Sequence, residues 1–213
     1  MGANKRSTEK RVVSVWMTRL STDRLRRDWQ AKSGGAKSAV PDRPLVTTLD
    51  MEGRCLIAAV SDDAAAEGLS PGMTLADARA IFPTLDARSD DPTADAALLR
   101  QLAMWGTRYS PWVAMEGRDG LFLDITGCAH LFGGEGALLD DLTTRLRKAG
   151  FAMRVGLADT PGAAWALARY GGSYSGDSGM IAPPGGVRAA LAGLPPAALR
   201  LGPATAGGLV RLG

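Results

Sequence analysis

The sequence predicts an α+β fold of the split-βαβ kind, in which a sheet carries helices on one face. Between Pro92 and Tyr170, hydrophobic periodicity changes in the order helix, strand, strand, helix, strand, helix. An apolar run near the N-terminus, Arg11–Met17, and the helical segment after it supply one more strand and helix. Hydrophobic residues make up 46% of the 213 residues, so apolar side chains suffice for a sizeable core.

The N-terminal elements follow from composition and from capping residues. The β-branched run Arg11–Met17 predicts a strand, and Ser21–Asp23 is expected to cap a helix over Asp23–Gln30. Residues 31–44 are rich in Gly, Ser and Pro, which is typical of a loop. One strand, one helix and a long connection are therefore expected here.

A hairpin and a short helix are expected next. Pro44–Asp50 and Arg54–Ser61 have strand-like composition and flank Glu52-Gly53, a pair suited to a tight turn. After a turn at Pro71-Gly72, Thr74 precedes an aspartate by three positions, a pattern that predicts the capped start of a helix.

The middle of the chain gives the clearest pattern. Apolar residues recur at helical spacing over Asp91–Ser110, which predicts an amphipathic helix. Two strand-like runs follow, Pro111–Glu116 and Gly120–Thr126, and Gly117–Asp119 is expected to form the turn between them.

The C-terminal part predicts a helix over Glu135–Gly150, a strand over Phe151–Ala158 and a helix over Thr160–Tyr170. Beyond these, Gly, Pro, Ala and Leu dominate, and we expect short helices and tight turns. The chain stops at Leu212-Gly213, where a helix would end, so a continuation is expected.

Composition narrows the functional class. The net charge of +3 and the pI near 9.1 are compatible with nucleic acid without requiring it. Two cysteines outside any CxxC pattern favour a reduced, cytoplasmic protein, and the single histidine excludes a multi-histidine metal site in this chain. No apolar run approaches the roughly 18 residues of a membrane span, so no membrane partner is expected.

The second predicted hairpin carries two acids that are candidates for metal binding. Asp119 and Asp124 flank the apolar strand, and a carboxylate at the end of such a strand is a candidate metal ligand. Asp119 is followed by Gly120, so no second acid stands beside it. Asp124 lies near a turn, where local hydrogen bonding is the favoured interpretation.

Other candidates are interpreted first as structural. Cys128 and His130 have no third ligand or orienting acid nearby, and Gly133-Gly134 is expected to form a turn into a helix rather than a phosphate site. The tryptophans are expected to serve packing. Four arginines near the first helix form either a solvated face or a surface for a partner or phosphate. They are Arg19, Arg24, Arg26 and Arg27.

Four stretches together resemble the Y-family DNA polymerases, and within them the ImuB-type branch of polymerase-shaped accessory proteins. They are "SVWMTRLSTDRLRR", "GLSPGMTLADARAIFP", "RYSPWVAMEGRDGLFLDITGCAHLFGG" and "FAMRVGLADTPGAAWALARYG". The resemblance implies a palm with a small fingers insertion and the start of a helical thumb. Its expected boundaries are a basic tail at 1–10, palm at 11–30 and 87–184, fingers at 31–86, and a truncated helix-hairpin-helix thumb at 185–213.

The resemblance also implies where a metal site would lie. Nucleotide addition uses two divalent metals held mainly by carboxylates. Active members have two acids on the first strand, and these positions match Trp16 and Thr18. At the hairpin Asp119 matches the retained Asp, and Gly120 replaces the Glu. We therefore expect no metal and no cofactor, with Mg²⁺ required only if the protein were active.

The triphosphate clamp of active members is expected to be missing as well. The Tyr and Arg that precede the fingers helix match Asp62 and Ala65, and an Asp would repel a triphosphate. The phosphate-binding helix aligns with 158–170, which has no lysine and only Arg169 near its end. The resemblance thus implies a chain that does not polymerise DNA.

DNA contact is expected from the last segment. It resembles half of a helix-hairpin-helix, whose glycine turn binds phosphates through main-chain amides. The residues concerned are Arg200, Gly202, Gly207 and Arg211. The resemblance implies further partners, largely through regions beyond this chain: a sliding clamp, a RecA-like accessory protein and an error-prone replicative-type polymerase.

The leading hypothesis is a non-catalytic, polymerase-like adaptor in DNA repair that supports damage-induced translesion synthesis and mutagenesis. The alternative is an active translesion polymerase that combines Asp119 with a displaced acid, namely Asp50, Glu116 or Asp124. A third possibility is a truncated product with no independent role.

Overall fold

The computed structural model describes residues 10–32, 43–172 and 179–200, which form two compact units. Within these residues, unit 1 comprises 10–18, 99–148, 153–172 and 179–200, and unit 2 comprises 19–32, 43–98 and 149–152. Helix α4 (Pro92–Gly106) begins in unit 2 and ends in unit 1. No helix of the described residues is long and apolar enough to span a membrane.

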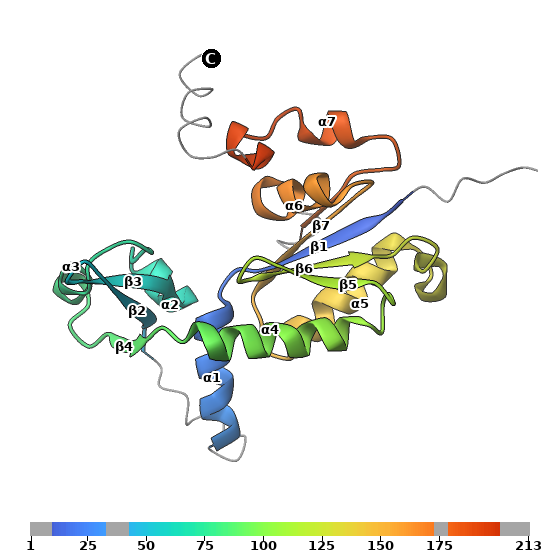
Figure 1. Cartoon of the computed structure of the whole chain (residues 1–213). Coiled ribbons are helices and arrows are strands. Elements are labelled where there is room, and N and C mark those ends of the chain that lie inside the picture. The colour runs from blue at the N-terminus through green and yellow to red at the C-terminus, as the bar shows by residue number, and fades with distance from the viewer. Residues whose placement is uncertain (1–9, 33–42, 173–178, 201–213) are drawn as a thin grey trace, which may run out of the picture. The chain divides into compact units, whose positions relative to one another are not determined.

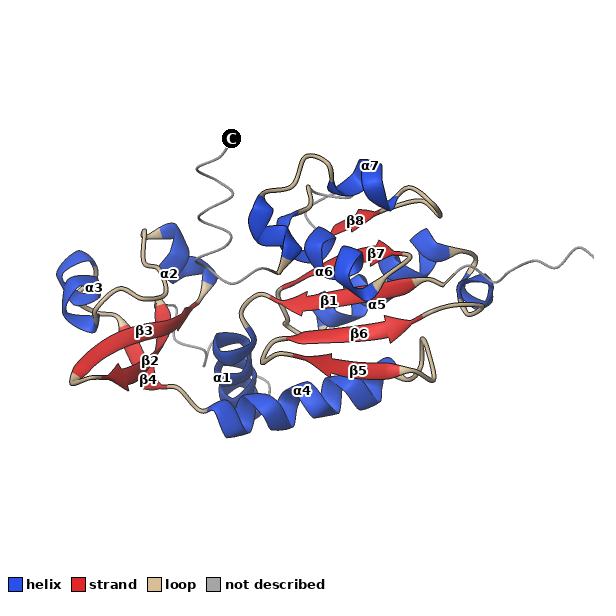
Figure 2. Ribbon diagram, turned by 45° about the horizontal axis from the view of Figure 1, so that its top comes forward, coloured by secondary structure: helices blue, strands red, loops and turns tan. Residues whose placement is uncertain are grey.

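Unit 1 is built on a five-stranded sheet in the order β5-β6-β1-β7-β8 (Figure 2). Its strands are β1 (Val12–Met17), β5 (Val113–Glu116), β6 (Gly120–Asp124), β7 (Met153–Ala158) and β8 (Gly179–Ile181). Neighbouring strands run antiparallel, except that β7 and β8 are parallel. The central strand β1 is buried at every position except Trp16, which is half-buried, as its apolar sequence requires.

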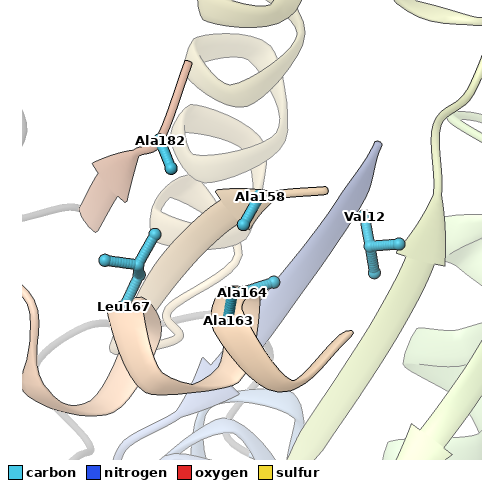
Figure 3. Packing of buried hydrophobic residues seen from close by; sticks show 6 residues of the cluster. All are labelled: Val12, Ala158, Ala163, Ala164, Leu167 and Ala182. Carbon is cyan, nitrogen blue, oxygen red and sulfur yellow. The ribbon is translucent and has the colours of Figure 1, made fainter. Parts of the chain in front are cut away.

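Helix α6 (Pro161–Tyr170) packs closely on one face of this sheet. Thr160 caps it by accepting the amide of Ala163, and Pro161 occupies its first turn. Gly156 on β7 permits the close approach, because a Cβ there would lie 2.2 Å from the carbonyl oxygen of Ala164. The contact is lined by small and branched apolar residues from α6, β1, β7 and the segment after β8 (Figure 3).

Helix α5 (Glu135–Lys148) covers the opposite face (Figures 1 and 2). Its buried residues Leu138, Leu142 and Leu146 recur every four positions and form one apolar stripe. The sequence predicted helices on one face only. Both faces need cover because alternate residues of β1, such as Val12 and Val13, are apolar and buried on opposite sides.

The rest of unit 1 consists of short helical pieces. The 3₁₀ turn η2 (Ala129–Phe132) leads into α5, and Gly133 and Gly134 follow it with φ of 89° and 118°, so this pair does form the predicted turn. Helix α7 (Val187–Leu191) packs against the same apolar cluster as α6, and η3 (Pro196–Leu199) follows it. The predicted short helices are therefore present up to residue 200.

Unit 2 contains a second sheet in the order β3-β2-β4, with β2 and β3 antiparallel and β2 and β4 parallel. Its strands are β2 (Leu45–Met51), β3 (Arg54–Val60) and β4 (Asp86–Ser89), and its helices are α1 (Leu20–Lys32), α2 (Asp62–Ala66) and α3 (Leu75–Ile81). The hairpin turns at Glu52-Gly53, both with positive φ, as predicted. Thr74 caps α3 by accepting the amide of Asp77, also as predicted.

Several details differ from the sequence predictions. Helix α1 begins at Leu20, so Ser21–Asp23 lie inside its first turns and do not cap it; the Thr22 hydroxyl donates to the Arg19 carbonyl instead. Strands β4 and β8 and helix α2 were not predicted, because segments of three to five residues show no periodicity. Most of the predicted loop at 31–44 lies outside the described residues.

Candidate functional site

The hairpin of β5 and β6 brings two carboxylates to the end of the sheet in unit 1. Glu116 is the last residue of β5, and Asp119 immediately precedes β6. On the neighbouring strand Trp16 stands opposite Gly120. The Asp119 carbonyl accepts the amide of Met17, which fixes the hairpin against β1. Three of the four positions that the resemblance places at a metal site, Trp16, Asp119 and Gly120, therefore lie together.

Both oxygens of the Asp119 carboxylate are engaged by donors of this chain. The indole Nε1 of Trp16 donates to Oδ2 at 2.8 Å. The guanidinium of Arg169, from the end of α6, donates to Oδ1 at 2.8 Å and to Oδ2 at 3.4 Å. Charge-assisted bonds of this kind satisfy the carboxylate within the protein.

Glu116 is held by two arginines. Its Oε2 lies 3.4 Å from a guanidinium nitrogen of Arg169, and its Oε1 accepts from Arg200 at 2.6 Å. The Glu116 side chain is only 13% exposed and that of Arg169 17%, so the pair is shielded from solvent screening. Arg169 therefore bridges Glu116 and Asp119.

Aromatic rings complete the arrangement. The guanidinium of Arg169 lies 4.8 Å from the ring centroid of Trp16 and 5.1 Å from that of Trp165. The guanidinium of Arg200 lies 4.8 Å from the Trp165 ring. Trp16, Arg169, Trp165 and Arg200 thus alternate as ring, cation, ring, cation, within the range of cation–π attraction. We call these four residues the Trp–Arg stack.

Gly120 leaves no room for a side chain. A Cβ at this position would lie 2.8 Å from the Glu116 carbonyl oxygen and 2.8 Å from Glu116 Oε2. A side chain at this position, such as the glutamate that the resemblance implies, would therefore require the backbone or Glu116 to shift.

These residues do not fit a pair of divalent cations. Neither the indole of Trp16 nor the backbone of Gly120 offers a carboxylate, and Asp119 already accepts from Trp16 and Arg169. No group of three or more His, Cys, Asp or Glu side chains in the described part of the chain is placed to hold a metal. The expectation that the protein uses no metal stays a prediction.

Comparison with known proteins decides the family. The sequence matches the impB/mucB/samB family over residues 37–169, which is more than half of the chain. The chain belongs to the impB/mucB/samB family. It is 54% identical over 146 residues to "Protein ImuB" of Caulobacter vibrioides, an alignment that covers 68% of this chain and 31% of that protein. The chain thus spans about a third of the curated relative that it matches.

Solved structures share the fold at low sequence identity. The insertion ternary complex of Dbh DNA polymerase matches with a TM-score of 0.74 and 18% identity, over 95% of this chain and 58% of that one. DinB from Sulfolobus solfataricus matches with a TM-score of 0.56 and 17% identity, over 74% of this chain and 45% of that one. The predicted α+β, polymerase-palm fold class and the resemblance to Y-family and ImuB-type proteins are confirmed.

In this member of the impB/mucB/samB family, the positions matching the triphosphate clamp lie in unit 2. Asp62 opens α2 and forms an ion pair with Arg19, while Ala65 is exposed on the same helix. The Asp62 carboxylate therefore has its own counter-ion within the chain. Thr18 lies in the turn between β1 and α1.

The arginines near α1 are paired with acids or carbonyl groups rather than gathered as a cationic patch. Arg24 donates to Asp95 at 2.6 Å, Arg26 pairs with Asp63, and Arg27 lies 4.4 Å from the Phe151 ring and donates to a carbonyl group. Of the two interpretations left open by the sequence, the phosphate-binding one is weakened.

The remaining candidates form local contacts. Asp124 accepts from the amide and hydroxyl of Thr126 at 3.1 and 2.5 Å, which is the turn role expected for it. Cys128 bonds to a nearby carbonyl, and both cysteines are free. Trp112 is 74% exposed, so the expectation that all tryptophans serve packing is wrong for this one, which immediately precedes edge strand β5.

The four predicted DNA-binding residues can be placed only in part. Arg200 ends η3 and bonds to Glu116, as described above. Gly202, Gly207 and Arg211 lie outside the described residues. Their role in DNA binding stays a prediction.

Sequence reasoning missed the cations that contact Glu116 and Asp119 of the β5–β6 hairpin, which we call the acidic hairpin. Arg169 and Trp165 lie on α6, and Arg200 is 84 residues from Glu116, so no local pattern links them to it. One signal was present: Arg169 is the single basic residue of a helix that carries lysine in active members.

Proposed function

We propose that the chain is part of a non-catalytic, polymerase-like adaptor in DNA repair that supports damage-induced translesion synthesis. Membership of the impB/mucB/samB family and the similarity to an ImuB protein support a role in the response to DNA damage. The polymerase fold supports a scaffold shaped to meet DNA.

One observation carries the non-catalytic part of the proposal. The carboxylate of Asp119, the acid retained from the active pattern, is bound by Trp16 and Arg169. A divalent metal would have to displace both donors and would then find no carboxylate at position 16 or 120. Without metals, neither the primer hydroxyl nor a triphosphate is activated.

The proposed partners follow from the family and not from contacts in this chain. DNA is expected to bind weakly here. A sliding clamp, a RecA-like accessory protein and an error-prone replicative-type polymerase would bind mainly through regions that the longer relatives contain beyond the aligned 31%. The proposed place of action is the cytoplasm.

A second candidate is an active polymerase with a displaced metal site that takes Mg²⁺. The observation in its favour is that Glu116 and Asp119 both contact the same guanidinium, so two carboxylates already converge on one cation. This second candidate requires the Arg169 guanidinium to move away from Glu116 and Asp119, so that a metal ion can take its place. Asp124 does not join them, because it lies at the opposite end of β6 beside Thr126.

Primer extension separates the two candidates. The full-length protein is incubated with primer–template DNA, all four nucleotides and either Mg²⁺ or Mn²⁺, with Dbh DNA polymerase as the positive control. We expect no template-directed incorporation. Incorporation that disappears in Asp119→Ala would establish the second candidate and refute the first.

A further inference from the structure

The acidic hairpin and the Trp–Arg stack form a closed cluster whose charges cancel. Glu116 and Asp119 contribute two negative charges, and Arg169 and Arg200 contribute two positive charges. The members come from four places in the chain: strand β1, the β5–β6 hairpin, helix α6 and the residue that follows η3. The cluster therefore joins α6 and the residue after η3, which are not strands, to the paired strands β1, β5 and β6.

We propose that Arg169 has taken over the role of the metal ions as the resident cation of the hairpin, and that the Trp–Arg stack uses it to hold residues 196–200 against helix α6 and the hairpin. This inference rests on the proposed loss of metal binding at the same site. It assigns the former metal site a positioning role for the segment that follows α6 and α7.

Burial indicates that the cation is a fixed part of this site. The side chains of Arg169 and Glu116 are 17% and 13% exposed, and a buried charge without a partner is costly. The Nε of Arg169 is buried and has no hydrogen-bond partner among the described residues, because the guanidinium is placed between the rings of Trp16 and Trp165. Only its outer nitrogens reach the two carboxylates.

The backbone of Arg200 provides an independent observation. Arg200 has a φ of 58°, one of two positive values at non-glycine residues in the described part of the chain. This left-handed conformation is uncommon for a long side chain and persists where surrounding contacts impose it. Here the contacts are the bond to Glu116 and the ring of Trp165. They hold the backbone of Arg200 in this conformation.

A stacking platform for single-stranded nucleic acid is a less suitable interpretation. Such platforms combine open aromatic faces with unpaired positive charge. In this cluster both arginines are paired with acids, and Arg169 lies between two rings. Phosphate attraction at the cluster is therefore weak, and an internal positioning role is favoured.

Hydrogen exchange tests the proposal directly. The amide of Ala198 donates to Pro195 and that of Arg200 donates to Ala197, so these two amides report on the η3 turn. The Arg200 side chain is 46% exposed, so we expect Arg200→Gln to fold and these two amides to exchange at least about tenfold faster in it. Arg188→Gln is the matched control, because Arg188 is exposed on nearby α7.

Two further variants locate the effect in the acidic pair. Glu116→Gln and Arg169→Gln should reproduce the faster exchange of Ala198 and Arg200, and amides of the β2–β3 hairpin in unit 2 should not change. The proposal would be overturned if the amides of the η3 turn exchanged at the wild-type rate in Arg200→Gln. It would also be overturned if Arg188→Gln accelerated their exchange as much as Arg200→Gln does.

Addition of Mg²⁺ to the wild-type chain completes the test. We expect no change in exchange at the β5–β6 hairpin or at η3, because Arg169 already supplies the cation. Protection by Mg²⁺ would overturn the resident-cation role. The outcomes remain separable from the proposed function: primer extension activity would refute the non-catalytic adaptor, whereas unaltered exchange in the variants would refute only the stack.

Discussion

At the scale of single residues, the site is defined by what each side chain can donate. Trp16 stands where the resemblance to Y-family polymerases implies an acid, and its indole N–H donates to the nearby carboxylate of Asp119. The same ring lies against the guanidinium of Arg169. A tryptophan at this position therefore offers no carboxylate to a metal ion and makes two contacts, one with Asp119 and one with Arg169.

Trp16→Phe separates these two contacts. The phenyl ring keeps a face for Arg169 but cannot donate to Asp119, so we expect a loss of about 1–2 kcal/mol in the free energy of unfolding. Urea denaturation followed by circular dichroism measures it. Trp112→Phe is the control, because Trp112 is exposed and its change should stay within about 0.5 kcal/mol. Equal effects of both variants would contradict the assigned role of the indole N–H.

Gly120→Ala tests the close packing of the hairpin. The new Cβ would lie 2.8 Å from a backbone carbonyl oxygen, so the strand or Glu116 must shift, and we expect destabilisation of about 1–3 kcal/mol. Gly162→Ala is the matched control, because nothing lies within 4 Å of its Cβ and alanine is the better residue in a helix. Thermal unfolding of both variants measures the difference. If Gly120→Ala unfolds like wild type, the packing described here is wrong.

At the scale of elements, a buried arginine joins the ends of several segments of unit 1. Arg11 precedes β1 and donates to both oxygens of Glu135 at 2.6 and 2.7 Å, to Asp159 at 2.6 Å and to the Ala182 carbonyl at 2.8 Å. These partners open α5, follow β7 and follow β8. The guanidinium therefore aligns one end of the sheet, as the Trp–Arg stack does for the acidic hairpin.

Arg11→Met should cost about 3–5 kcal/mol of unfolding free energy, because it leaves two poorly solvated carboxylates without their cation. Arg11→Lys should cost less but still destabilise, because a lysine cannot reach Glu135, Asp159 and Ala182 together. Urea titration of both variants measures their unfolding free energies and shows whether Arg11→Met loses more than Arg11→Lys. Retention of wild-type stability by Arg11→Met would show that the contacts of Arg11 with Glu135, Asp159 and Ala182 are not needed for stability.

The elements that the sequence predicted are those with a local signal. Long periodic segments such as α4, α5 and α6 were predicted, and so were the hairpin at Glu52-Gly53 and the cap at Thr74. The short strands β4 and β8 gave no such signal. At the site, the family resemblance drew attention to Trp16 and Asp119, which are in contact in the structure. The cations were not foreseen, because their positions depend on contacts between residues 50 or more apart in the chain.

At the scale of the whole molecule, one buried acid links folding to pH. Burial raises the pKa of Asp23 from 3.8 to about 6, and the Ala152 amide and the charges of Arg19 and Arg26 oppose this shift. Asp62 raises the pKa further. The folded state therefore binds a proton at Asp23 over a range in which the unfolded chain has released it.

Stability should consequently depend on pH through Asp23. Between about pH 4 and pH 6 the folded state holds more protons at Asp23 than the unfolded state does. The contribution of Asp23 to the free energy of unfolding therefore falls as pH rises through the folded pKa, and it stays low above that pH. The total change is on the order of 2–3 kcal/mol. The difference in unfolding free energy between wild type and Asp23→Asn isolates the contribution of Asp23, because the contributions of the other acids are the same in both proteins. A difference that does not vary from pH 4 to pH 7 would contradict the buried, raised-pKa carboxyl.

The central claim, that cations of the chain itself occupy the place of metal ions, is tested most directly by electron paramagnetic resonance of added Mn²⁺. Free hydrated Mn²⁺ gives a sharp spectrum that weakens when the ion binds a protein. We predict that the spectrum with the wild-type protein matches that of buffer at every ratio of metal to protein. A saturable loss of signal with wild type that is absent in Asp119→Ala would contradict the account.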